Sequence, residues 1–551
     1  MIINSDRSTI RSTVVMLAAA ALVVAGAVTA GARTPTAEAA ANTVAAAPVE
    51  DDGTDCPVSL PGSLPANAKL PDPFTKLNGS RVSSRSDWRC RRAEIKKLAE
   101  RYVYGEKPAK PASVTGTVSS TSITVNVTHN GRSASFSAGV QLPSGSGPFP
   151  AVVVVGGFGA DTATIRAAGA AVISYDPLAV GKEGTPRNNK QGAFYSLYGA
   201  TSSTGLLAAW AWGVSRIIDV VEQSGGSVLK ADALGVTGCS RYGKSAFAVG
   251  AFDQRVALTM PIESGSAGAP ILRGIPGESG AQPLSSAYSE QPWLGDAFSS
   301  FTGNPNALPV DTHETVAMIA PRGLFIMENP HIDWLAARSG SVAALAGAEV
   351  YKALGAGENI TYWSDIQDGN HCAVRSEWRT PLQQNIQKFL LKTGNAAGTF
   401  RISSKKAGNL AQWRDWTTPT LTASPSDPPT TTPPTTTPPT TTPPTTTPPT
   451  TPPAESGCSA SVSVNQWPGG FDASVRVTAG AAPVTGWTVA VALPSGASVT
   501  NAWNATRSGN TGTVQFTNVS YNGALAPGQS VEFGYQGSGT GAGMTPTCTA
   551  R

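Results

Sequence analysis

Hydrophobic residues in the middle of this chain come in short continuous runs bounded by glycine, proline or aspartate. Four of these runs predict strands buried on both faces: Ala151–Val155, Gly169–Tyr175, Val256–Ile262 and Gly323–Met327. Residues 205–220 lie between them and have the length and composition of a helix. Buried strands that alternate with helices predict a parallel sheet covered by helices on both faces.

The segments before this region have a different pattern. Residues 115–127 and 133–142 alternate polar and apolar side chains, which predicts antiparallel strands. Residues 87–104 have the apolar spacing of an amphipathic helix. Antiparallel strands that precede a parallel sheet fit the front edge of an α/β-hydrolase, a three-layer sandwich, and we predict this domain over 52–416.

The C-terminal part contains a linker and a second domain. Residues 428–453 are only proline and threonine, which favours extended polyproline II and cannot build a core. We place the linker at 417–456. Residues 457–551 form short alternating segments separated by Gly, Pro and Asn, which predicts an all-β sandwich.

The N-terminus has the layout of a secretory signal peptide. Arg7 and Arg11 precede an uncharged run at 12–32, and small residues follow it. We expect cleavage of residues 1–41 and a secreted protein without a membrane segment; an uncleaved anchor is the alternative, since the run is just long enough to span. Residues 41–55 are small and polar, and we expect no ordered structure there.

Net charge and cysteine content bear on the partners and on the disulfides that we expect. The net charge of +4 comes without a basic block, so nothing indicates a nucleic-acid partner. Export permits disulfides, and six cysteines allow fifteen pairings. The six are Cys56, Cys90, Cys239, Cys372, Cys458 and Cys548.

Ser240 is the candidate nucleophile. It stands in Gly238-Cys-Ser-Arg-Tyr-Gly243, between a strand that ends near Val236 and a small apolar helix at 245–252. A serine at a sharp strand-to-helix turn is raised above the sheet, and the amide after it can face an oxyanion. The alternative is a serine that only caps the helix.

A serine nucleophile needs a base and an acid, which follow it in the order Ser, acid, His in α/β-hydrolases. His371 follows the strand-like segment 360–366 and fits the base; the alternative is an exposed loop histidine. For the acid, Glu263 follows the next strand after the serine. Glu328 and Asp333 follow the strand after that, so the acid stays open at this point.

Two cysteines adjoin the candidate pair. Cys239 directly precedes Ser240, and Cys372 directly follows His371, so a Cys239–Cys372 disulfide would tie nucleophile to base. The remaining pairs would then be Cys56–Cys90 and Cys458–Cys548. Two buried free thiols are the alternative to the first pair.

Four motifs together resemble the glucuronoyl esterases, carbohydrate esterase family fifteen: GCSRYGK at 238–244, PIESGSAG at 261–268, IDWL at 332–335 and GNHC at 369–372. The likeness runs through most of 56–391. It implies Ser240 as nucleophile, His371 as base and Glu263 as acid, as in the fungal type. Some bacterial members place the acid after the following strand, which keeps Glu328 or Asp333 as second choice.

The same resemblance implies substrate contacts. Arg241 would help its own backbone amide to stabilise the oxyanion, and Lys244 would hold sugar hydroxyls. Gln282 and Glu290, spaced eight apart, and Trp334 match further contacts of the family; for Trp334 the alternative is core packing.

The implied activity is a carboxylic ester hydrolase acting on 4-O-methyl-D-glucuronoyl esters that link glucuronoxylan to lignin alcohols. We expect a monomer without metal or other cofactor. An acetyl-xylan or other carbohydrate esterase, and a catalytically silent wall-binding protein, are the alternatives.

The C-terminal domain resembles family-two carbohydrate-binding modules in its motifs NQWPGGF at 465–471, GWT at 486–488, NAWN at 501–504 and YNG at 521–523. The likeness implies a flat strip of three aromatic residues that stacks on sugar rings: Trp467, Trp503 and Tyr521. Trp487 is expected in the core instead. The implied ligand is crystalline cellulose, with xylan second.

Overall fold

The computed structural model describes residues 49–394, 398–422, 457–467, 469–519 and 522–551. The described residues form three hydrophobic clusters, two before residue 422 and one after residue 457, which define two domains. The predicted signal peptide and most of the predicted linker lie outside the described residues. Among the helices that are described, none combines the length and the apolar character needed to cross a membrane.

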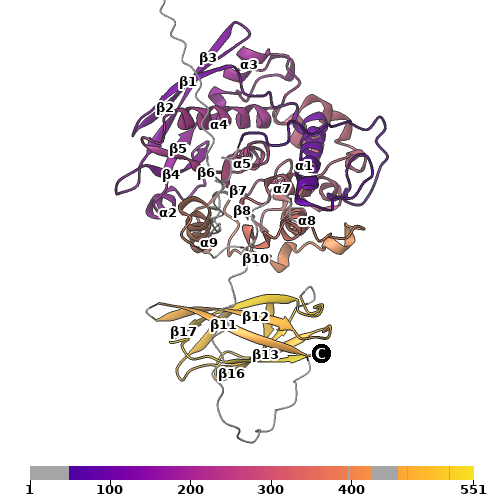
Figure 1. The fold of residues 1–551 in the computed structure, drawn as a ribbon, viewed down its shortest axis with the longest axis vertical. Coiled ribbons are helices and arrows are strands. Elements are labelled where there is room, and N and C mark those ends of the chain that lie inside the picture. The colour runs from indigo at the N-terminus through magenta and orange to yellow at the C-terminus, as the bar shows by residue number, and fades with distance from the viewer. Residues whose placement is uncertain (1–48, 395–397, 423–456, 468, 520–521) are drawn as a thin grey trace, which may run out of the picture. The chain divides into compact units, whose positions relative to one another are not determined.

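The N-terminal domain is built on a ten-stranded sheet with the order β1-β2-β3-β5-β4-β6-β7-β8-β9-β10 (Figure 1). Strands β4 to β10 are parallel, and β1, β2 and β3 form an antiparallel edge. The bounds are β1 Ser113–Val118, β2 Ser122–His129, β3 Arg132–Gln141, β4 Phe149–Val155, β5 Ala171–Tyr175, β6 Leu229–Cys239, β7 Val256–Ile262, β8 Gly323–Met327, β9 Ile360–Trp363 and β10 Phe400–Arg401.

Helices cover both faces of this sheet. Val152 and Val154 of β4 belong to a core shared with α2 and α9, whereas Val153 and Val155 belong to the core with α4, α5, α7 and α8. The three-layer sandwich confirms the predicted fold class. The helices are α1 Arg85–Ala99, α2 Thr162–Ala167, α3 Ala193–Tyr198, α4 Leu206–Gln223, α5 Arg241–Phe252, α6 Leu284–Ser289, α7 Thr312–Ile319, α8 Ala337–Ala353 and α9 Ser376–Ile386; π-helical turns extend α1 through Tyr104 and α9 through Leu391.

The segment predicted as one strand over 115–127 is two strands. A turn separates β1 from β2, and Ser119 holds it: its N–H donates to the Ser122 carbonyl (2.8 Å) and its hydroxyl accepts from the Ser122 N–H (3.0 Å). The alternation of side chains is interrupted at the turn by four polar residues at 119–122, a signal in the sequence that the one-strand prediction overlooked.

The prediction that residues 41–55 lack structure is wrong for 49–55. Glu50 pairs with Lys107 and Arg216 at the edge of a buried network of charges. Arg255 lies at the centre of this network and binds Asp253 (2.8 Å) and Asp219 (2.7 Å), whose side chains are fully buried. At the other end of the domain, Thr422 pairs with Ser84, so the ordered chain also runs past 416.

We expect Arg255→Ala to lower the free energy of unfolding of this domain by about 3–5 kcal/mol, because it leaves two buried carboxylates without their shared cation. Lys392→Ala is the control: Lys392 and Asp232 form a 2.8 Å pair with both side chains 61% exposed, and its loss should cost at most about 1 kcal/mol. Urea unfolding followed by tryptophan fluorescence compares the two. Equal midpoints would contradict the expectation.

The C-terminal domain is a sandwich of two four-stranded antiparallel sheets, β11-β12-β17-β14 and β15-β16-β13-β18. The strands are β11 Cys458–Trp467, β12 Gly470–Ala479, β13 Trp487–Ala492, β14 Ser498–Trp503, β15 Ala505–Arg507, β16 Thr513–Asn518, β17 Ser530–Ser538 and β18 Pro546–Ala550. A Cys458–Cys548 disulfide joins β11 to β18. This architecture confirms the predicted all-β sandwich.

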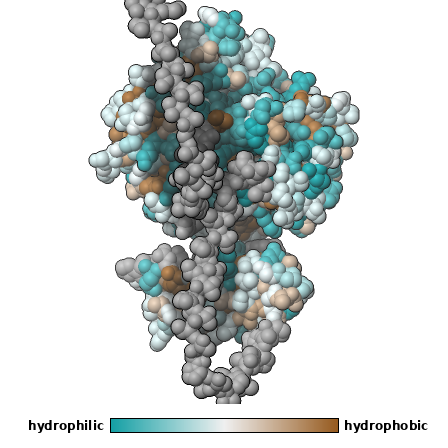
Figure 2. All heavy atoms as spheres, viewed as in Figure 1, coloured by the Kyte–Doolittle hydropathy of each residue, from teal (hydrophilic) through white to brown (hydrophobic). Residues whose placement is uncertain are grey.

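Large exposed hydrophobic side chains are few among the described residues. On the face shown in Figure 2, brown residues are scattered among teal ones in both domains. Three of the exposed side chains, Phe158, Trp334 and Val374, lie in the loops that follow β4, β8 and β9. These loops lie at the carboxyl ends of parallel strands, the edge where α/β sheets place their ligands.

Candidate active site

Ser240 occupies a strained turn between β6 and α5, with φ 59° and ψ −125°. Such backbone angles are costly for a residue with a side chain and persist only where the surroundings impose them. Two glycines make the turn possible. A Cβ on Gly238 would lie 2.5 Å from the Tyr242 carbonyl oxygen, and one on Gly243 would lie 2.4 Å from that of Ile262. The Gly-x-Ser-x-x-Gly spacing therefore has a steric reason.

His371 is oriented by a buried carboxylate. Its Nδ1 lies 2.7 Å from Glu263 Oε2, and the Glu263 side chain is fully buried. The Cys372 N–H donates to the same oxygen (2.8 Å), and Asn329 Nδ2 donates to Oε1 (3.2 Å). Arg375 adds a cation 3.5 Å from Oε1. Every partner of Glu263 is a donor or a cation, which suits an ionised carboxylate that only accepts.

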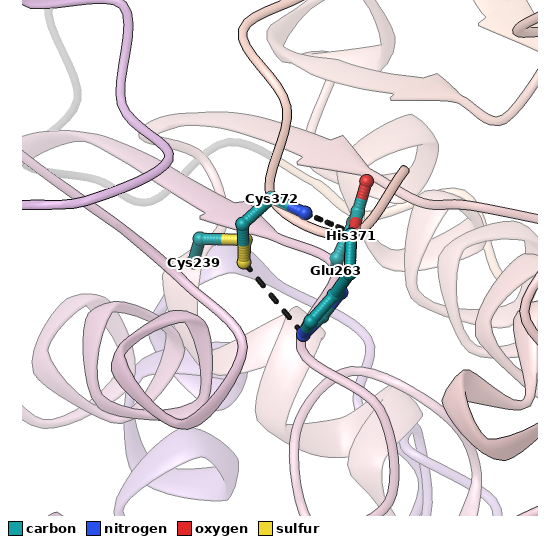
Figure 3. A group of neighbouring side chains, drawn as sticks. All are labelled: Cys239, Glu263, His371 and Cys372. Carbon is teal, nitrogen blue, oxygen red and sulfur yellow. Dashed lines mark hydrogen bonds and ion pairs between the residues drawn. A yellow bond between two sulfur atoms is a disulfide. The ribbon is translucent and has the colours of Figure 1, made fainter. Parts of the chain in front are cut away.

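Ser240 and His371 are held close by a covalent bond. The Cys239–Cys372 disulfide joins the residue before Ser240 to the residue after His371, with the two Cα atoms 5.8 Å apart (Figure 3). The other two disulfides are Cys56–Cys90 and Cys458–Cys548. These three pairs are the ones predicted from the positions of the cysteines.

The second ring nitrogen of His371 has a weaker contact. Nε2 lies 3.7 Å from Cys372 Sγ (Figure 3), and the described contacts of His371 include no hydrogen bond to the Ser240 hydroxyl. Catalytic hydrogen bonds often form or tighten only when substrate is bound. Nδ1 is engaged by Glu263, so Nε2 is the nitrogen left to exchange a proton with a serine or with substrate.

The other candidate acids are placed differently. Glu328 is fully buried, and neither of its carboxylate oxygens has a hydrogen-bond partner in the described structure. Burial raises the pKa of Glu328 well above its ordinary value, and the negative charge of Glu263 adds to this. Asp333 lies at the surface and pairs with Lys406 at 2.9 Å. Neither side chain contacts His371.

The remaining histidines are engaged elsewhere. His129 lies 3.1 Å from Asn130, His313 Nε2 lies 2.9 Å from the Pro71 carbonyl and His331 Nε2 lies 2.9 Å from the Ile366 carbonyl.

The Arg241 guanidinium is held on two sides. Its Nη1 donates to Glu183 Oε2 (3.0 Å), and its Nη2 lies 3.6 Å from Glu290 Oε1. Glu290 in turn accepts from Gln282 Nε2 (2.8 Å). The structure thus brings together Arg241, Gln282 and Glu290, which the sequence predicted as separate contacts. All three side chains are partly exposed and can meet a ligand.

Lys244 is largely buried beside the candidate nucleophile. Only 5% of the residue is exposed, and its ammonium donates to the Ser264 (2.6 Å) and Ser266 (2.7 Å) carbonyls. Burial lowers the pKa of Lys244 to about 8. An ammonium has three donors, so one remains for a ligand.

Trp334 is not a core residue. It is 53% exposed, and its ring meets the His371 ring edge to face at 6.1 Å between centroids. An exposed indole beside the candidate base is a surface on which a sugar ring can stack.

Trp293 also belongs to the site, since its Nε1 donates to Glu183 Oε1 (2.6 Å). Sequence reasoning missed four residues of this site: Glu183, Trp293, Asn329 and Arg375. Asn329 directly follows Glu328, and Arg375 lies three residues beyond Cys372, so proximity to the motifs was a usable signal for these two. Glu183 and Trp293 lie in irregular loops without a local pattern, and nothing in the sequence marks them.

The cluster of side chains at 239, 263, 371 and 372 does not form a metal site. Its four potential ligand atoms lie within 4.8 Å of one another. Two of them, however, are the sulfurs of the Cys239–Cys372 disulfide, which cannot supply the thiolates that bind metals.

The predicted aromatic strip of the C-terminal domain lies outside the described residues. This holds for Tyr521 and for the side chains of Trp467 and Trp503. Trp487 is fully buried, and its Nε1 donates to the Asn522 carbonyl (2.8 Å), so it belongs to the core as predicted.

Comparison with known proteins identifies both domains. A model of fungal glucuronyl esterases matches residues 125–355, and a model of cellulose-binding domains matches residues 458–550. Together with the three-layer sheet, these matches define the class: an ester hydrolase of the α/β-hydrolase fold that carries a cellulose-binding domain.

Relatives of known activity fix the family. The 4-O-methyl-glucuronoyl methylesterase of Hypocrea jecorina is 39% identical over 370 residues, covering 66% of this chain and 79% of the relative. The 4-O-methyl-glucuronoyl methylesterase of Thermothelomyces thermophilus is 40% identical over 356 residues, covering 64% of this chain and 88% of the relative. A glucuronoyl esterase mutant from Sporotrichum thermophile, solved in complex with methyl 4-O-methyl-β-D-glucopyranuronate, superposes with a TM-score of 0.62 at 39% identity and covers 67% of this chain and all of that one. The chain belongs to the glucuronoyl esterase family.

Proposed function

We propose that this protein is a secreted serine esterase that hydrolyses 4-O-methyl-D-glucuronoyl esters between glucuronoxylan and lignin alcohols. The observation that carries the proposal is the His371–Glu263 bond, joined through the Cys239–Cys372 disulfide to the strained turn at Ser240. A base oriented by a buried carboxylate, next to a serine raised on a sharp turn, is the arrangement required for nucleophilic attack on an ester.

The reaction proceeds in two halves. His371 Nε2 takes the Ser240 proton while Oγ attacks the uronate carbonyl, and Glu263 stabilises the imidazolium that forms. The Arg241 N–H and guanidinium stabilise the tetrahedral oxyanion. His371 then protonates the departing alcohol. Water, deprotonated by His371, attacks the acyl-enzyme in the same way, and the carboxylic acid leaves with Ser240 restored.

The uronate half of the ester binds beside Arg241. Gln282, Glu290 and the free donor of Lys244 offer polar partners for sugar hydroxyls, and Trp334 offers a ring to stack on. The solved relative with bound methyl 4-O-methyl-glucopyranuronate supports this class of substrate. An acetyl group has no ring or hydroxyl of its own for these side chains to bind, which is why acetyl-xylan hydrolysis is the less favoured reading.

The C-terminal domain holds the enzyme at the plant cell wall. Its match to cellulose-binding domains supports cellulose as the surface, with xylan second, through Trp467, Trp503 and Tyr521. The signal-peptide pattern of residues 1–41 supports export, and the scattered exposed hydrophobics of the described surface support a monomer.

The test compares two esters and one surface. We expect the purified full-length protein to hydrolyse benzyl glucuronate, to release no acetate from acetylated xylan, and to be depleted from solution by microcrystalline cellulose. Acetate release without uronate hydrolysis would transfer the activity to the acetyl-esterase alternative. Silence on both esters with cellulose binding retained would leave a wall-binding protein.

A further inference from the structure

Glu183 lies between the candidate oxyanion arginine and a buried tryptophan. It stands in the loop between β5 and α3, and its side chain is only 13% exposed. One carboxylate oxygen accepts from Arg241 Nη1 (3.0 Å) and the other from Trp293 Nε1 (2.6 Å). Both oxygens therefore meet donors, and the carboxylate joins the two side chains.

Trp293 is a rigid support for this bridge. It is 2% exposed, so its indole cannot turn away from Glu183. The Arg241 guanidinium lies 5.5 Å from the ring centroid and the Lys244 ammonium 5.4 Å from it, within the range of cation–π attraction. The same indole thus contacts Arg241 through its ring and fixes the Glu183 carboxylate through its N–H.

The loops that carry Glu183 and Trp293 are cross-linked. The Gly184 N–H donates to Gln291 Oε1 (2.7 Å). Arg187 donates to the Leu294 carbonyl (2.7 Å), and its guanidinium lies 3.5 Å from the centroid of the Tyr288 ring. Each contact joins the Glu183 loop to the segment that carries Trp293. Glu183 therefore stands on a fixed framework, not on a free loop.

We propose that Glu183, supported by Trp293, is a positioning residue that fixes the Arg241 guanidinium where the oxyanion forms. The inference rests on the proposed function, in which Arg241 stabilises that oxyanion. A long arginine side chain that is 36% exposed samples many rotamers unless it is held, and a donor aids catalysis most when it is already in place. Glu290 also lies near Arg241, but at 3.6 Å, at 40% exposure and with Gln282 as a second partner, so it restrains Arg241 less.

The test is Glu183→Gln. A glutamine offers one acceptor and one donor where two donors converge, so one of the two bonds is lost. We expect kcat on methyl glucuronate to fall about 10-fold, with KM changed less than about 2-fold, because substrate still binds while the transition state loses a well-placed donor. Glu222→Gln is the matched control. Glu222 also accepts from an arginine, Arg255 Nη1, at 3.0 Å, but this pair lies outside the site. The kcat of the Glu222→Gln variant should therefore equal that of wild type.

A double-mutant cycle separates positioning from a general structural effect. In an Arg241→Ala background, Glu183→Gln should lower kcat no further, because Glu183 acts through Arg241. Trp293→Phe keeps an aromatic ring but removes the N–H that binds Glu183. We expect a smaller loss of kcat, which should also vanish in the Arg241→Ala background. This variant replaces Glu183→Gln in the test if Glu183→Gln does not fold.

Three results would overturn the inference: wild-type kcat in Glu183→Gln, a loss of the same size in the Arg241→Ala background, or a loss only in KM. If Arg241→Ala itself kept the wild-type rate, the oxyanion assignment of the proposed function would fail instead.

Discussion

Ser240→Ala should lower kcat on benzyl glucuronate by roughly 10⁵-fold, the largest effect expected of any single substitution in this chain. Without Oγ no acyl-enzyme forms, so the remaining donors can assist only direct attack by water. The alanine must adopt the same turn as Ser240, with φ 59°, but the Gly238 and Gly243 contacts that impose this turn stay unchanged. We therefore expect a folded, inactive protein.

The measurement is initial-rate kinetics together with a thermal melt and cellulose depletion. Ser240→Ala should melt near the wild-type temperature and bind cellulose as wild type does. Activity within 100-fold of wild type, in a preparation free of wild-type contamination, would show that Ser240 is not the nucleophile.

Glu263→Gln should lower kcat by about 10³- to 10⁴-fold, because the group opposite His371 Nδ1 would no longer be a charged acceptor. The partners of Glu263 at His371, Cys372 and Asn329 all approach as donors. A glutamine must present an NH₂ to one of them. The imidazole then loses its orientation and the charge that stabilises its protonated form.

Glu328→Gln is the matched substitution at the competing acid. Burial raises the pKa of Glu328 and so favours its uncharged form, which an amide of the same shape resembles in charge. We expect a rate change of less than about 3-fold. The kcat values of the two variants at pH 7 decide which carboxyl group is the acid that orients His371. A larger loss of kcat in Glu328→Gln than in Glu263→Gln would reverse the assignment.

The fold was predictable because buried strands appear in the sequence as continuous runs of apolar residues. A central strand of a parallel sheet is apolar on both sides, so Val256–Ile262 and Gly323–Met327 were found with the bounds that the structure has. The turn at Ser119 was missed although the sequence marks it: four polar residues at 119–122 interrupt the alternation, and the apolar positions change from even in β1 to odd in β2. The order at 49–55 was missed because it depends on Glu50 meeting cations far along the chain, which local composition cannot show.

The candidate site was predictable where a motif places it on a turn. Ser240, Glu263 and His371 each directly follow or closely follow a strand, so chain order was enough to group them. The acid was open from sequence because Glu263 and Glu328 both follow strands; only the hydrogen bonds distinguish them. Glu183 could not be found, because its position follows from contacts with Trp293 and Arg241, which lie more than fifty residues away along the chain.

The Cys239–Cys372 bond also has a consequence for the unfolded chain. It closes a ring over a sequence separation of 133 residues that contains β7, β8 and β9, so it removes much of the loop entropy that the open chain would have. Within that ring, Ser240 and His371 stay neighbours even when every strand has come apart. When the protein unfolds under oxidising conditions, the two side chains therefore lose their relative orientation but stay close together. They can move far apart in the unfolded chain only after the disulfide is reduced.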